Sequence, residues 1–199
     1  GNRWAEPFRA MRIEEMIREG GPFDVDAVRR QQLDVRDVMA ERYLDRALES
    51  AERAGLAEAA ELLRGWDLNA DADSRAAALF YVWHERLRQA AARSLYGGPA
   101  GWFPADALTD VLERRALPWV EGGAGEAYAE LAGRAMLEAD SIVAGRAWGE
   151  LQRVRLEHAL GEVELLDRSL GLNLGPLPIG GSANTVNVAH HAGGDFPVH

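Results

Sequence analysis

The longest periodic stretch of the chain begins at Asp73 or Ser74, runs to about Tyr96 and predicts a long helix. Apolar residues recur in it at three- and four-residue spacing, and Gly97-Gly98-Pro99 ends the pattern. Either Asp73 or Ser74 is a suitable N-cap residue. A helix of this length must cover its apolar stripe with other elements of the fold. The stripe consists of Leu79, Phe80, Trp83, Leu87, Ala90, Ala91 and Leu95.

Shorter helical patterns fill most of the chain on either side of this stretch. Each is bounded by a capping residue, a glycine or a proline. We expect these helices over residues 7–19, 24–32, 34–54, 56–63, 104–117 and 126–143. The chain is therefore predicted to be mainly α, with residues 1–146 forming a helical domain.

After the last predicted helix, glycine and proline punctuate short segments. Residues 148–160 mix charged and apolar side chains and are compatible with a strand or with an irregular arm. Two glycines, Gly180 and Gly181, indicate a flexible bend, and residues 184–189 alternate as a strand does. We expect 147–199 to form an arm and an incomplete return to a β core, with the segment from Gly171 onward lacking a strand to pair with.

Charge and composition exclude several functional classes. The net charge of −10 argues against a nucleic-acid partner, because such binding needs a basic surface. No apolar run approaches the roughly 18 residues that cross a bilayer, so we expect no membrane partner. Cysteine is absent, which excludes a disulfide framework, a thiolate metal site and a cysteine nucleophile.

The histidines and serines give no catalytic motif. We expect His84 to be a surface or helix-contact residue and His158 to pack beneath the arm. His190, His191 and His199 are expected to be exposed rather than to bind a metal. Ser182 is the serine that lies in a loop suited to a site, but no GxSxG elbow surrounds it or any other serine.

Several segments carry a family pattern, and they occur in a fixed order along the chain. They are Asn2-Arg3 with Pro7–Ile13, Gln31–Val35, Leu62–Asp67 with Ala76–Trp83, Trp148–Leu151 with Glu157–Leu160, and Gly180–Asn187. Together they resemble the penicillin acylase (penicillin amidase) family of N-terminal-nucleophile hydrolases. Two positions depart from the pattern: Gln152 stands where the family has histidine, and Ala159 where it has proline.

The resemblance implies that the chain is an internal slice of the β chain, namely the helical region of an αββα Ntn-hydrolase. Family members are precursors that cut themselves into α and β chains, and the β chain then begins with the catalytic serine. The free α-amino group of that serine acts as its base. Gly1 cannot take this role, so the fragment alone is expected to be inactive.

The same resemblance implies what the parent protein does. It would be an amidohydrolase that cleaves a linear amide, releasing an acyl group from a β-lactam nucleus, a homoserine lactone or a lipopeptide. Its partners would be the remainder of the acylase α and β chains and the small-molecule amide. A periplasmic or secreted location is expected, with no cofactor in this fragment and calcium as a candidate ion in the parent protein.

One catalytic residue is implied within these residues. The asparagine of the family's Thr-Val-Asn motif donates a hydrogen bond in the oxyanion hole, and this asparagine corresponds to Asn187. Asn184 is the nearby competitor, for which a structural role in a turn is favoured. The alternative function, favoured by the helical body, is a non-catalytic helical binding or scaffold module.

Overall fold

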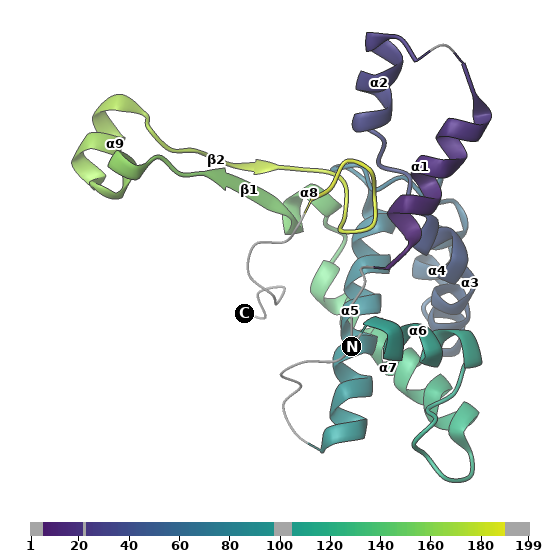
Figure 1. Cartoon of the computed structure of the whole chain (residues 1–199). Coiled ribbons are helices and arrows are strands. Elements are labelled where there is room, and N and C mark those ends of the chain that lie inside the picture. Colours follow the sequence, from purple (N-terminus) through teal and green to yellow (C-terminus); the bar gives the residue numbers. More distant parts are fainter. Residues whose placement is uncertain (1–5, 22, 98–104, 190–199) are drawn as a thin grey trace.

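The computed structural model describes residues 6–21, 23–97 and 105–189. Figure 1 shows a body of helices from which one long arm projects. The body contains α1 (Phe8–Glu19), α2 (Val25–Gln32), α3 (Val38–Arg53), α4 (Ala57–Arg64), α5 (Arg75–Tyr96), α6 (Ala105–Arg114), α7 (Ala124–Val143) and α8 (Trp148–Leu151). The arm contains β1 (Arg153–Leu156), a short 3-10 helix (Ala159–Glu162), α9 (Glu164–Leu170) and β2 (Leu174–Pro178). The prediction of a mainly α chain with a short β segment is confirmed, whereas the division at residue 146 stays a prediction.

Helix α5 is the centre of the body, and α3, α4, α7 and α8 all pack against it. Every side chain from Ala76 to Trp83 is buried, so the first half of the helix is covered on all sides. The run of small alanines lets neighbouring helices approach closely. The predicted stripe is confirmed from Leu79 to Leu87, whose large apolar side chains are buried. Leu95, at the far end of the helix, is 39% exposed.

The helix ends follow the capping residues of the sequence. Ser74 accepts a hydrogen bond of 3.1 Å from the N–H of Ala77 at the start of α5, and Gly97 ends that helix in the left-handed conformation. The predicted helix over 34–54 begins later than expected. Asp37 is its N-cap, so α3 starts at Val38 and residues 34–36 remain extended.

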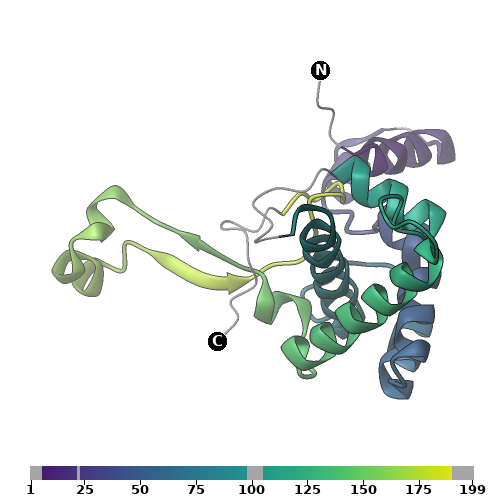
Figure 2. The same cartoon turned by 90° about the horizontal axis from the view of Figure 1, so that it is seen from below.

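The arm is a two-stranded antiparallel ribbon with α9 at its tip (Figure 2). Val154 pairs with Leu177, and Leu156 pairs with Leu174. The expectation that the segment after Gly171 has no strand to pair with is therefore wrong. The segment 148–160, left open between strand and irregular arm, contains α8, β1 and the first half of the 3-10 helix.

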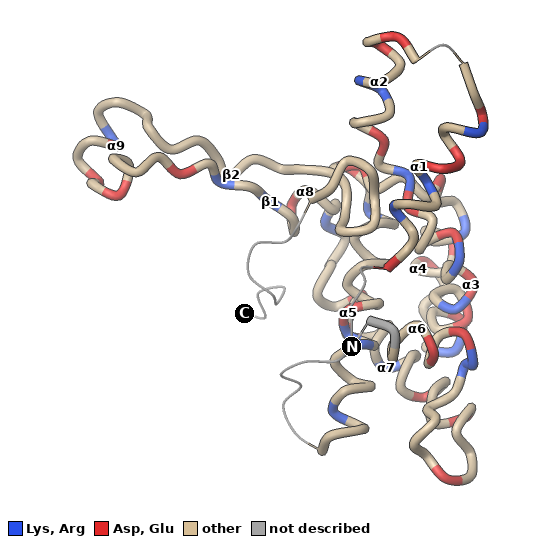
Figure 3. The backbone as a smooth tube through the Cα atoms, in the orientation of Figure 1, with Lys and Arg blue, Asp and Glu red and all other residues tan. Residues whose placement is uncertain are grey.

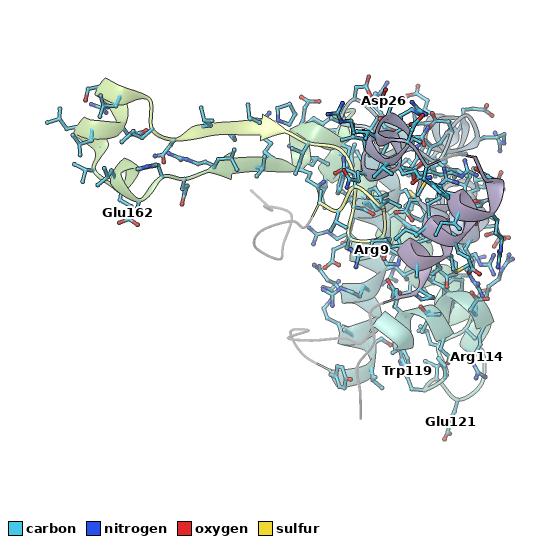
Figure 4. The ribbon with its side chains drawn as sticks, turned by 45° about the horizontal axis from the view of Figure 1, so that its top comes forward. Arg9, Asp26, Arg114, Trp119, Glu121 and Glu162 are labelled. Atoms are coloured by element: carbon cyan, nitrogen blue, oxygen red, sulfur yellow. The ribbon has the colours of Figure 1, made fainter. Side chains whose placement is uncertain are left out.

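Charge is distributed differently over the two parts of the molecule. Acidic and basic residues alternate along the helices of the body, whereas long stretches of the arm carry neither (Figure 3). Figure 4 shows side chains standing free along both strands of the arm, with Glu162 near its tip. The exposed apolar residues of the arm are Leu156, Leu160, Val163, Leu165, Leu170, Leu174 and Leu177.

The strand predicted over 184–189 is absent. These residues form a compact turn, in which an isolated bridge joins Ser182 to Val188. The turn forms because the Thr185 hydroxyl bonds to main-chain groups of its own loop, which competes with an extended ladder. The alternating polar and apolar residues therefore belong to a loop and not to a strand.

Candidate functional site

The residues that follow the arm return to the body as one loop, residues 180–189, which we call the site loop. It lies over the N-terminal end of α3 beside the first turns of α5 (Figure 1). Main-chain bonds attach both of its halves to the body. The N–H of Gly181 donates to the carbonyl of Ala70 at 2.7 Å, and the N–H of Asn187 donates to the carbonyl of Asp34 at 2.9 Å.

Asp37 is the anchor beneath this loop, and its side chain is fully buried. Its Oδ1 atom accepts from the N–H groups of Met39 and Ala40 at 2.8 and 3.2 Å, which caps α3. Its Oδ2 atom accepts from the hydroxyls of Tyr81 and Ser182 at 2.6 and 2.9 Å. One carboxylate thus joins α3, α5 and the site loop.

Sequence reasoning missed Asp37 because its bond to Ser182 joins residues 145 positions apart. The signal that could have located its local role was an aspartate directly in front of the apolar run Val38-Met39-Ala40, which is typical of an N-cap. Periodicity gave no sign of the long-range partner.

The two glycines of the loop are required for close approach rather than for flexibility. A Cβ atom at Gly180 would lie 2.7 Å from the carbonyl oxygen of Ala70. Gly181 has φ of 84°, and a Cβ atom there would overlap the carbonyl oxygen of Asn187. The predicted flexible bend is therefore a tightly packed turn.

Helix α8 and Gln152, the residue that follows it, hold the same turn. The indole N–H of Trp148 and the side-chain amide of Gln152 both donate to the carbonyl of Gly181, at 2.8 and 2.9 Å. The Trp148 ring also packs on Tyr81 with 4.6 Å between centroids. Gln152, which stands where the resemblance led us to expect histidine, is thus a buried donor to the site loop.

Asn187 lies on the loop with its main chain fixed and its side chain partly exposed. Its carbonyl accepts from the Thr185 hydroxyl at 2.7 Å, and its N–H is bound to Asp34. Within the described ranges, no hydrogen bond engages its carboxamide. A fixed backbone with an unengaged amide donor is suited to hydrogen-bonding an external oxygen.

Asn184 and Ser182 are engaged in internal contacts. The Asn184 amide contacts the sulfur of Met39 at 3.0 Å, and its own N–H donates to the Ser182 hydroxyl at 3.0 Å. It lies in a turn, as its predicted structural role requires. Ser182 is buried with its hydroxyl directed to Asp37. Its position indicates a structural role, since its hydroxyl donates to a carboxylate that already caps α3, and among the described residues no histidine is hydrogen-bonded to it.

An ion pair between Arg12 and Asp34 supports the segment that binds the main chain of Asn187. The guanidinium of Arg12 on α1 binds both carboxylate oxygens of Asp34, at 3.1 and 2.7 Å. The two side chains are largely buried, with exposed fractions of 14% for Arg12 and 17% for Asp34. Helix α1 therefore fixes the residue whose carbonyl receives the Asn187 N–H.

Burial dominates the electrostatics around the loop. It raises the pKa of the Asp37 carboxyl, and the hydrogen bonds from Tyr81, Ser182, Ala40 and Met39 oppose that rise. Burial also raises the pKa of Glu6, against hydrogen bonds from Thr109 and Asn184. The pKa of Tyr81 is raised by burial and by the adjacent Asp37 charge.

The structure places two of the five histidines, and one of them differs from its predicted role. His84 is partly buried and stacks on the Phe80 ring, with 6.3 Å between centroids; burial lowers its pKa to about 4. His158 is exposed and caps the 3-10 helix of the arm by accepting from the N–H of Leu160, so the expected packing beneath the arm is wrong. His190, His191 and His199 lie outside the described residues. Over the ranges that are described, no three acidic or histidine side chains gather in a way that could hold a metal ion.

A comparison with known families adds to this geometry. The sequence model of the family described as penicillin amidase matches residues 1–199. The chain belongs to the penicillin amidase family. Membership supports an amide-cleaving hydrolase of that family and favours this function over a scaffold module. No curated protein matches the chain in sequence.

A helix that spans a bilayer needs about 20 predominantly apolar residues. Among the helices in the described ranges, none has both the length and the apolar character required.

Proposed function

We propose that this part of the penicillin amidase supplies the oxyanion-hole donor Asn187. In the proposed reaction, an N-terminal serine outside these 199 residues attacks the carbonyl of a linear amide. The carbonyl oxygen gains negative charge, and the Asn187 side-chain N–H donates to it. The acyl-serine that forms on loss of the amine is then hydrolysed, which releases the carboxylic acid.

One observation carries the proposal: Asn187 has both main-chain polar groups bound and its carboxamide without a hydrogen bond inside the described fold. A donor stabilises a transition state best when its position is fixed before the charge develops. The other asparagine of the site loop, Asn184, has its amide against Met39 and is unsuited to this task.

The wider setting is also proposed. The substrate would be a small-molecule amide whose amine portion is a β-lactam nucleus, a homoserine lactone or a lipopeptide. The partners would be the remainder of the acylase α and β chains, and the exposed leucines of the arm are a surface that such a partner can cover. We propose a periplasmic or secreted location, supported by family alone. Calcium is the ion proposed for the parent protein, and among the described residues no three acidic or histidine side chains form a cluster for it.

Substitution of Asn187 in the complete enzyme tests the proposal. Asn187→Ala should lower kcat by about 10²–10³-fold, the typical cost of losing one oxyanion-hole donor, with little change in KM. Asn184→Ala is the matched control, because it removes the other loop carboxamide and should cost far less activity. A kcat of Asn187→Ala close to that of the parent enzyme would remove Asn187 from the site.

The isolated 199-residue chain gives a second check. Because the proposed nucleophile lies outside it, the purified chain should hydrolyse neither penicillin G nor an acyl-homoserine lactone. Hydrolysis that exceeds the buffer rate and follows the protein through purification would contradict an external serine.

A further inference from the structure

The buried carboxylate of Asp37 has a role that its helix-capping function leaves unexplained. Capping α3 uses only Oδ1, which accepts from Met39 and Ala40. The second oxygen, Oδ2, binds the Ser182 hydroxyl at 2.9 Å and the Tyr81 hydroxyl at 2.6 Å. A neutral cap such as serine would serve the helix without bringing a charge into the core.

Ser182 makes hydrogen bonds to several other residues of the site loop. Its N–H donates to the Thr185 hydroxyl at 2.8 Å, and that hydroxyl donates to the carbonyl of Asn187 at 2.7 Å. The Ser182 carbonyl accepts a hydrogen bond from the N–H of Ala189 at 3.2 Å. The residues on which Ser182 acts thus include Asn187 and a residue just beyond it, so a shift of Ser182 moves the asparagine.

We propose that Asp37 is a positioning residue for Asn187, which it holds in register with the substrate oxyanion through Ser182 and Thr185. This inference rests on the proposed function, in which Asn187 is the oxyanion donor. Asp37 itself touches no reacting atom. Its contribution is the fixed acceptor that orients Ser182.

Asp37→Asn in the complete enzyme separates the two uses of the carboxylate. Asparagine caps helices about as well as aspartate, so α3 should retain its first turn. The amide nitrogen, however, replaces an acceptor with a donor where Ser182 and Tyr81 each donate. We expect kcat to fall about 10–100-fold, the scale associated with misplacing a catalytic group by an ångström or less, while KM changes less than about twofold.

A double-mutant cycle with Asn187→Ala distinguishes positioning from general loss of structure. If Asp37 acts through Asn187, Asp37→Asn should reduce kcat by less than about twofold once the asparagine side chain is absent. A purely structural defect would instead multiply the two losses. Rates are taken per active site, by titration of the acyl-serine burst, so that misfolded enzyme does not contribute.

Asp24→Asn is the matched control, since Asp24 caps α2 through its Oδ1 and the N–H of Ala27, away from the loop. It should leave kcat unchanged. If Asp37→Asn is not recovered as folded enzyme, Ser182→Ala replaces it in the cycle, because it removes the same hydrogen bond and leaves the cap intact.

The outcomes separate the two proposals. Losses that multiply in the cycle, or a normal kcat for Asp37→Asn or its substitute Ser182→Ala, would overturn the role of Asp37 while leaving Asn187 in place. A normal kcat for Asn187→Ala would overturn the proposed function itself, and the positioning role with it. A low kcat for both single variants with no further loss in the double variant supports the inference.

Discussion

The carboxylate of Asp37 accepts a hydrogen bond of 2.9 Å from the hydroxyl of Ser182, although 145 residues separate them in the sequence. This bond attaches the loop that follows the arm to the first turn of a helix near the beginning of the chain. The helical body is therefore the support of the Thr-Val-Asn turn, and changes in either part should be measurable in the other.

Gly181→Ala should disturb the loop more than a positive φ alone accounts for. An alanine at positive φ costs roughly 1–2 kcal/mol in any position. At Gly181 the added methyl group also overlaps the Asn187 carbonyl, so a further cost of about 1–3 kcal/mol is expected. Denaturant unfolding of the two variants Gly181→Ala and Gly55→Ala measures the difference.

Gly55 is a suitable control because its φ of 72° is similar and nothing lies within 4 Å of the added Cβ. Equal losses of unfolding free energy for the two alanine variants would show that Gly181 is needed only for its backbone angle. In that case the close approach to Asn187 would have no measurable weight.

Arg12→Gln should weaken the attachment of α1 to the segment that receives the Asn187 N–H. The pair of Arg12 and Asp34 is bidentate and largely buried, so its loss should cost about 1–3 kcal/mol of unfolding free energy. Arg18→Gln breaks an exposed pair with Glu14 on the same helix and should cost less than about 1 kcal/mol. Thermal unfolding of both variants is the measurement, and equal costs would contradict the special weight of Arg12.

His84 should make the body sensitive to mild acid. Burial lowers its pKa from the ordinary value of 6.5 to about 4, so the folded state binds the proton more weakly than the unfolded chain. The stability that this provides is complete above pH 6.5 and is lost as the pH falls through about 4. Between these values, the unfolding free energy of the unmodified protein should fall more steeply than that of His84→Gln.

Unfolding is measured at pH steps between 7 and 4, with His158→Gln as the control for removal of an exposed imidazole. Parallel curves for the unmodified protein and His84→Gln would show that His84 titrates equally in the folded and unfolded states.

Local features of the fold could be predicted from the sequence. The apolar spacing and the two candidate caps Asp73 and Ser74 placed α5, and Asp24 placed the start of α2, because caps and periodicity act within a few residues. The start of α3 was missed by several residues, because Asp34 and Asp37 are both acceptable caps and the helix begins after the second of them.

The site loop shows why the rest could not be predicted. The alternation in residues 184–189 favours a strand, but the Thr185 hydroxyl closes a turn and the Gly181 backbone packs against Asn187. Tyr81, Trp148 and Gln152 support the loop from distant parts of the chain. No short-range pattern contains those partners, whereas the asparagine itself was indicated by the family motif.

The most direct test of the account measures how the complete enzyme and its Asn187→Ala variant bind a transition-state analogue. A boronic acid that adds to the catalytic serine presents an oxygen where the oxyanion forms. If Asn187 donates to that oxygen, the inhibition constant of the boronic acid should be about 10²–10³-fold higher for Asn187→Ala than for the unmodified enzyme. This rise should parallel the fall in kcat/KM. An unchanged inhibition constant would contradict Asn187 as the oxyanion-hole donor.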